Sequence, residues 1–133
     1  MEDINSLTEK VIGLAIEVHR ELGPGLLESA YEQCLCYELS LNGLEFQCQQ
    51  RLPVRYKGVL IDCHYQYDIL IKDRLLIEVK AVAEIHPVHE AQLLTYLKLL
   101  NIDHGLLLNF NVPVLKDGIK RRIRKGAQAA LPS

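Results

Sequence analysis

Residues 75–82 read LLIEVKAV, an apolar run with only two charged side chains, Glu78 and Lys80. A run that is apolar on both faces is typical of a central strand that is covered on both sides of its sheet. Side chains two apart on a strand share a face, so the carboxylate and the amine lie side by side. Burying either charge alone would cost several kcal/mol. The pair is therefore either a structural ion pair or part of a functional site.

Asp68 brings a second carboxylate to this place. It lies in the strand-like segment 65–71, and Lys72 and Asp73 supply a short turn into the apolar run. A tight hairpin would set Asp68 opposite Glu78, with the side chains roughly 5 Å apart. At that distance two carboxylates repel by on the order of 3 kcal/mol at an effective dielectric of about 20. A hard cation relieves this repulsion, so the sequence predicts a site for Mg²⁺ or Mn²⁺.

Helical patterns flank the strand-rich middle of the chain. The residues from Ser6 to Glu9 have the form of a capping box, and the apolar stripe after them predicts a helix ending near Leu22. A second helix is expected over 26–41 and a third from Pro87 to about residue 100. Strands are expected at 46–50, 54–61 (a hairpin), 65–71, 74–82, 105–110 and 119–124. The pattern predicts one α/β domain spanning 1–133.

Composition indicates a globular protein without a membrane partner. The chain has 133 residues, is 49% hydrophobic and carries a net charge of −2. No apolar stretch reaches the ~18 residues of a membrane span, and the acidic start is unlike a secretory signal, so the cytoplasm is the expected location. Residues 1–45 hold nine acids against two bases. Basic residues gather near the end, either as a solvated surface or as a track for a phosphate backbone: Lys116, Lys120, Arg121, Arg122, Arg124 and Lys125.

The four cysteines do not predict a zinc site or a disulfide framework. Cys34 and Cys36 are two apart in a helical pattern, so their side chains point in different directions. Cys48 and Cys63 stand alone, and the chain has no C-x-x-C pair. Reduced, buried thiols are the expected state. A cysteine-based redox or zinc protein is therefore not favoured.

Asp68 and the later Glu-Val-Lys at 78–80 resemble the signature of the PD-(D/E)XK nuclease superfamily. The chain more closely resembles the bacterial GxxExxY family within it, whose naming motif reads GLLESAY at residues 25–31. Further matching segments are 67–70 (YDIL), 77–82 (IEVKAV), 89–97 (HEAQLLTYL) and 105–110 (GLLLNF). Tyr67 stands where the superfamily name has proline.

This resemblance implies a restriction-endonuclease-like core, a mixed β-sheet flanked by helices in the order α-α-β-β-β-β-α-β. It implies that a divalent metal binds Asp68, Glu78, the Val79 carbonyl and Glu28. The catalytic set it implies is Asp68, Glu78, Lys80, Gln92 and Glu28, with Lys80 orienting water or stabilising charge on the phosphorane. We expect substrate contacts from Tyr96, Tyr31, Lys120, Arg121 and Arg122.

Several of these residues also have simpler interpretations. Glu28 follows a Gly-Pro-Gly break, and an acid is favoured at a helix N-terminus. Tyr31 and Tyr96 could be core residues. Gln92 lies four residues before Tyr96, so the two side chains share a helix face and can reach one site together. His86 and His89 could bind a metal, but solvated imidazoles at a helix start are the favoured interpretation.

The sequence therefore predicts a metal-dependent nuclease that hydrolyses phosphodiester bonds in DNA or RNA. The alternative is a catalytically silent domain of the same fold, acting as a nucleic-acid-binding or assembly module. The intact set of Asp68, Glu78 and Lys80 favours the enzyme, while the acidic N-terminal part favours the module. The expected partner is nucleic acid, a homodimer is allowed, and the sequence does not choose between DNA and RNA or between endo- and exonucleolytic cleavage.

Overall fold

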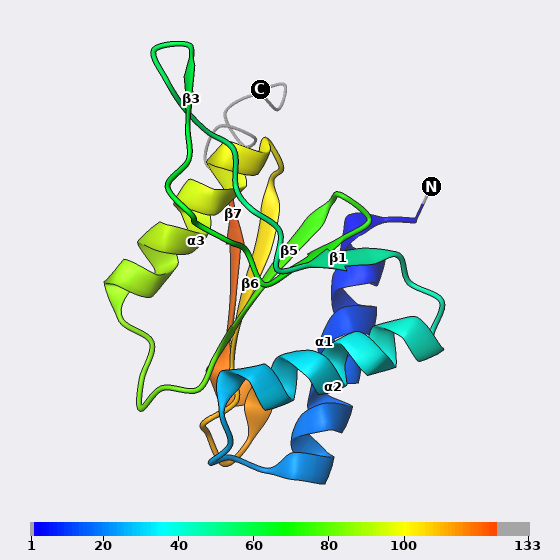
Figure 1. The fold of residues 1–133 in the computed structure, drawn as a ribbon. Coiled ribbons are helices and arrows are strands. Elements are labelled where there is room, and N and C mark those ends of the chain that lie inside the picture. The colour runs from blue at the N-terminus through cyan, green and yellow to red at the C-terminus, as the bar shows by residue number, and fades with distance from the viewer. Residues whose placement is uncertain (1, 125–133) are drawn as a thin grey trace, which may run out of the picture.

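A computed structural model describes residues 2–124, and these form a five-stranded mixed sheet with helices on both faces (Figure 1). The helices are α1 (Ile4–Leu22), α2 (Glu28–Leu41), α3 (Pro87–Leu100) and the short 3₁₀ helix η1 (Leu115–Gly118). The strands are β1 (Phe46–Cys48), β2 (Val54–Tyr56), β3 (Val59–Ile61), β4 (Ile69–Ile71), β5 (Leu75–Lys80), β6 (His104–Asn109) and β7 (Ile119–Ile123). The expected α/β class, a mixed sheet flanked by helices, is confirmed.

The strand order of the sheet is β1-β4-β5-β6-β7, so the apolar run forms the central strand β5, as expected. β5 pairs antiparallel with β4 and parallel with β6, and α3 makes the crossover between β5 and β6. The element order differs from the expected α-α-β-β-β-β-α-β: five strands precede α3 and two follow it. The difference arises because β2 and β3 form a separate two-stranded hairpin and β7 adds an edge strand.

The two faces of the sheet bury separate hydrophobic clusters. One face packs against α1 and α2, and its sheet residues include Ile69, Ile71, Ile77, Val79, Leu106 and Leu108. The other face packs against α3, and its sheet residues include Leu70, Leu76 and Leu107. The packing on this second face is close, because a Cβ at Gly105 would lie 2.9 Å from Cδ1 of Leu93 on α3. Alternation along β5 therefore directs positions 78 and 80 to the face that α3 covers.

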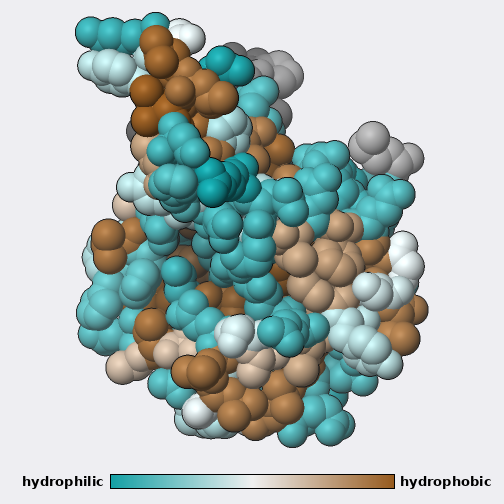
Figure 2. Space-filling model, viewed as in Figure 1, coloured by the Kyte–Doolittle hydropathy of each residue, from teal (hydrophilic) through white to brown (hydrophobic). Residues whose placement is uncertain are grey.

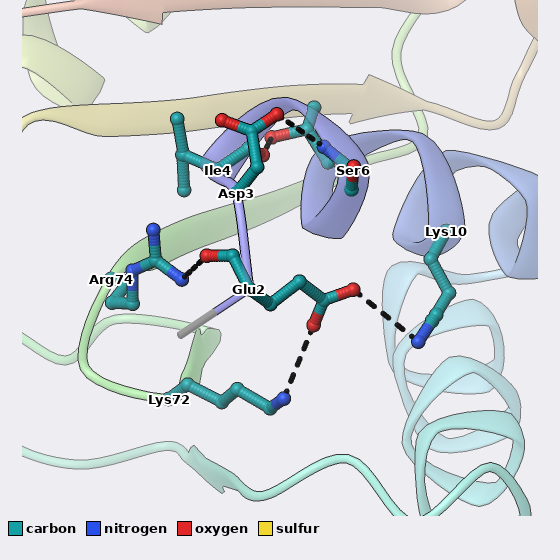
Figure 3. Close-up of polar contacts among 8 residues, drawn as sticks. Glu2, Asp3, Ile4, Ser6, Lys10, Lys72 and Arg74 are labelled. Atoms are coloured by element: carbon teal, nitrogen blue, oxygen red, sulfur yellow. Dashed lines mark hydrogen bonds and ion pairs between the residues drawn. The ribbon is translucent and has the colours of Figure 1, made fainter.

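The start of α1 is tied to the turn between β4 and β5 (Figure 3). Glu2 forms ion pairs with Lys10 at 3.4 Å and Lys72 at 3.3 Å, and Arg74 donates to the Glu2 carbonyl at 2.6 Å. Asp3 caps the helix by accepting a hydrogen bond from the Ser6 backbone. The expected capping box with Ser6 as the cap is therefore wrong, because α1 begins earlier, at Ile4.

The turn itself has an uncommon backbone conformation. Lys72 and Asp73 both have positive φ, 52° and 53°, which is the pattern of a type I′ turn. The Arg74 amide closes the turn by donating to the Ile71 carbonyl at 2.9 Å. Such turns match the twist of paired strands, so this turn fixes how β4 and β5 pair.

The β2–β3 hairpin extends away from the sheet (Figure 1). Its side chains are mostly exposed, and brown apolar atoms lie along it behind a hydrophilic tip (Figure 2). Among the described helices, none is both long enough and apolar enough to cross a bilayer.

Candidate active site

Asp68 lies one residue before β4 and Glu78 lies on β5. The last pair of the strand register is Ile69 with Ile77, so positions 68 and 78 are neighbours where the two strands stop pairing. The Asp68 amide donates to Glu78 Oε2 at 2.8 Å, and the Val79 amide donates to Asp68 Oδ2 at 2.7 Å. Each carboxylate is thus held by a backbone amide of the neighbouring strand. The two acids therefore approach each other across the strands, as the sequence predicts.

Burial makes this pair electrostatically unfavourable in the absence of a cation. Glu78 is only 4% exposed, and its burial, reinforced by the charge of Asp68, raises the pKa of its carboxyl group to about 8. The hydrogen bond from the Asp68 amide and the charge of Lys80 act in the opposite direction. A nearby cation would favour the ionised carboxylate. The arrangement therefore matches a place where positive charge binds.

Lys80 lies at the end of β5 on the same face as Glu78, with a half-buried side chain. Within residues 2–124 its amine forms no ion pair, although its charge lowers the pKa of Glu78. A structural ion pair between Glu78 and Lys80, which was the alternative interpretation, is therefore not formed. The amine stays available for an anionic ligand.

The donor set fits a hard divalent ion that also binds substrate. Among the described residues no three His, Cys, Asp or Glu side chains form a ready-made metal-binding group. Mg²⁺, however, is commonly bound by one or two carboxylates, several waters and the phosphates of a substrate. Glu78 Oε2 and Asp68 Oδ2 each accept from a backbone amide, and Asp68 Oδ1 accepts from the Gln49 side chain. Among the described residues Glu78 Oε1 has no hydrogen-bond partner, and the Asp68 oxygens keep further lone pairs that a metal could use.

Glu32 and Gln49 join the site and were missed in the sequence. The Gln49 side-chain amide donates to Glu32 Oε1 at 2.7 Å and to Asp68 Oδ1 at 3.2 Å. The Gln49 backbone amide also donates to the Asp68 carbonyl at 2.9 Å. Burial raises the pKa of Glu32, and the charges of Asp68 and Glu28 contribute. Glu32 could have been found, because it lies one helical turn after Glu28; Gln49 could not, because it follows β1 in a loop with a positive φ of 53°.

Glu28 and Tyr31 both have structural explanations. Glu28 is exposed at the first turn of α2, which agrees with the simpler interpretation of an acid at a helix N-terminus, and its metal role stays a prediction. Tyr31 is fully buried and stacks on Phe110, with ring centroids 4.5 Å apart. Its hydroxyl donates to the Gly23 carbonyl and accepts from the Leu26 amide. Tyr31 therefore has no surface for a substrate; it is a packing residue that holds the loop before α2.

Gln92 and Tyr96 lie together on α3 beside the carboxylates. The Gln92 amide donates to the Tyr96 hydroxyl at 3.0 Å, which confirms that the two side chains share a helix face. Tyr96 is 6% exposed, and its burial raises the pKa of its hydroxyl, with a further contribution from the charge of Glu78. Tyr96 thus combines a core position with a hydroxyl near the site.

The three basic residues of β7 have different surroundings and do not form one basic surface. Lys120 pairs with Leu107, which pairs with Glu78, so Lys120 lies level with Glu78 on the same face, two strands away. Arg121 points to the other face and donates to Asn5 on α1 at 2.7 Å. Arg122 forms an ion pair with Glu90 on α3. Of the three, Lys120 is the best placed for a substrate; Lys125 lies outside the described residues.

The remaining candidates take structural roles. The His86 amide donates to Nδ1 of His89 at 3.0 Å, which places both rings at the start of α3, as the favoured interpretation had it. All four cysteines are free thiols. Cys63 is exposed and the other three are half-buried.

Comparison with known proteins gives one match. A family model described as the PD-(D/E)XK nuclease superfamily matches residues 5–122. No curated protein and no solved structure matches the chain. The matched region includes every residue described above at the carboxylate pair.

Proposed function

Since the chain belongs to the PD-(D/E)XK nuclease superfamily, we propose that it hydrolyses phosphodiester bonds in DNA or RNA with Mg²⁺ or Mn²⁺. The observation that carries the proposal is the cross-strand pair of Asp68 and Glu78, which shares its face with the amine of Lys80. Members of this superfamily are generally nucleases that use such ions. We also propose that the chain belongs to the GxxExxY family within this superfamily.

Asp68 and Glu78 would hold the ion through the oxygens that face away from the backbone amides. The ion would supply a water of lowered pKa and would polarise a phosphoryl oxygen. Lys80 has its amine where it can orient that water or oppose the negative charge that develops on the phosphorus oxygens. The Gln92 amide and Tyr96 hydroxyl would position the substrate from the α3 side. Lys120 would contact a flanking phosphate.

Glu32 is a better candidate than Glu28 for the helical acid of the site. Gln49 bridges Glu32 to Asp68, whereas Glu28 is exposed one turn away. Glu32 would contact the ion directly or hold one of its waters. Glu28 would contribute charge and the start of α2.

The test is a cleavage screen of labelled single-stranded and double-stranded DNA and RNA, with and without Mn²⁺. We expect cleavage only with the metal and a loss of about 10²-fold or more for Lys80→Ala. Unchanged cleavage by that variant would contradict the assigned chemistry, and full activity without metal would remove the metal mechanism. Binding without cleavage of any substrate would favour the silent binding module.

A further inference from the structure

An exposed tyrosine lies beside Tyr96 and has no role in the chemistry above. Tyr65 is 51% exposed, and its ring centroid lies 6.3 Å from that of Tyr96, with the planes tilted by 58°. Tyr96 in turn lies close enough to Glu78 and Asp68 for both carboxylates to act on its hydroxyl. The two rings therefore form an aromatic step that leads from solvent to the candidate site.

The backbone around Tyr65 is fixed although its side chain is exposed. The Leu52 amide donates to the Tyr65 carbonyl at 2.9 Å, and the Tyr67 amide donates to the Gln50 carbonyl at 3.1 Å. An isolated bridge pairs Arg51 with Gln66 between these two bonds. An aromatic ring on a held backbone loses little conformational freedom when a ligand packs on it.

The charges near this step do not favour binding through phosphates alone. Arg51 donates to both carboxylate oxygens of Asp62, at 2.9 and 2.8 Å, and Arg122 pairs with Glu90. Glu32 adds negative charge beside Asp68. Binding of duplex backbones depends on many phosphate contacts by cations. With these arginines paired within the protein, Lys80 and Lys120 are the basic side chains that the site offers to phosphates, so contact with the bases would add to its affinity.

We propose that Tyr65 stacks on an unpaired base of the strand that is cut, and that single-stranded nucleic acid is the substrate class. The inference rests on the proposed nuclease function. Stacking on a tyrosine needs a free base face, which single strands offer and the interior of a duplex does not. Each stacked base contributes enough to replace missing backbone contacts, and stacking tolerates any base. The protein is therefore expected to bind single strands with little sequence preference.

The test measures binding without metal, so that it does not depend on cleavage. The anisotropy of short labelled single strands, DNA and RNA, is compared with that of a blunt-ended duplex without a loop. Tyr65→Ala should weaken single-strand binding roughly tenfold, and Tyr65→Phe should restore it. The matched control is Tyr37→Ala, because Tyr37 is 65% exposed on α2 and makes no ring contact within the described part of the chain. That control should bind like the wild type.

Three outcomes would overturn the stacking role. These are Tyr65→Ala binding single strands like the wild type, Tyr37→Ala losing as much affinity as Tyr65→Ala, and wild type binding the duplex at least as tightly as the single strand. Metal-dependent cleavage by the wild type is scored separately. If the wild type cleaves and Tyr65→Ala binds single strands normally, the stacking inference fails and the nuclease proposal stands. If binding depends on Tyr65 but the wild type does not cleave, the nuclease proposal fails and the stacking role stands.

Discussion

The two hairpins of this protein reverse the usual relation between polarity and burial. The hairpin of β4 and β5 is buried, yet its open end carries Asp68, Glu78 and Lys80. The hairpin of β2 and β3 is exposed, yet its strand β3 consists of apolar residues. The side chains of Val59, Leu60 and Ile61 are 58%, 60% and 38% exposed. Buried charge has a cost that ion pairs, hydrogen bonds or a bound ligand offset, whereas exposed apolar groups cost little stability in the monomer. The candidate active site therefore lies at the open end of the first hairpin, and the second hairpin presents apolar side chains to solvent.

The largest expected effect is the loss of cleavage on changing Asp68, beside β4, compared with Asp62, beside β3. Asp68→Asn keeps an oxygen to accept from the Val79 amide but removes a charge from the metal site, so cleavage should fall by about 10³-fold or more. The matched control is Asp62→Asn, which removes an exposed acid beside the other hairpin. Cleavage assays with Mn²⁺ measure both. Equal losses in the two variants would contradict the assignment of the site.

Truncating a leucine should destabilise the protein much more in the β4–β5 hairpin than in the β2–β3 hairpin. Leu76 is fully buried against α3, so Leu76→Ala should cost about 2–5 kcal/mol of unfolding free energy. Leu60→Ala removes an exposed side chain of equal size and should change stability by less than about 0.5 kcal/mol. Urea unfolding curves give both values. A large loss for Leu60→Ala would mean that the second hairpin is packed in solution.

The pKa of Glu78 predicts how metal-free stability changes with pH. The folded pKa of about 8 exceeds the ordinary value of 4.5, so folding favours the protonated form. This contribution is fully present below pH 4.5 and is lost as pH rises through about 8, at about 1.4 kcal/mol per pKa unit at most. Thermal melts of Glu78→Gln in EDTA should lack this decline. Parallel melting curves for variant and wild type would contradict it.

The smallest effect concerns the bridge between α2 and Asp68. Gln49→Gly removes the side-chain amide without straining the positive φ, and metal affinity should fall by about tenfold because Glu32 and Asp68 lose their common partner. The neighbouring Gln50→Gly removes an amide that bonds only to the Cys48 carbonyl in the described structure. Isothermal titration with Mn²⁺ compares the two. Normal affinity in Gln49→Gly would exclude this positioning role.

The sequence predicted the central strand and the carboxylate pair because both follow from local periodicity. Two apolar faces identify β5, and a short turn places Asp68 opposite Glu78. It did not predict Glu32, Gln49 or Tyr65, because their places depend on how a helix and a loop pack against the end of β4. The role of Tyr31 was mistaken because a hydroxyl near a motif does not reveal its burial.

The turn at Lys72 and Asp73 has a consequence for how the candidate site could be lost. Since strand pairing alternates with a period of two, a slip of one residue between β4 and β5 would turn the side chains of one strand to the opposite face and move Asp68 away from Glu78. The molecule could keep its strands and helices while the two acids no longer met. A single inserted residue in this turn is therefore a way to abolish the candidate site with all of its side chains still present.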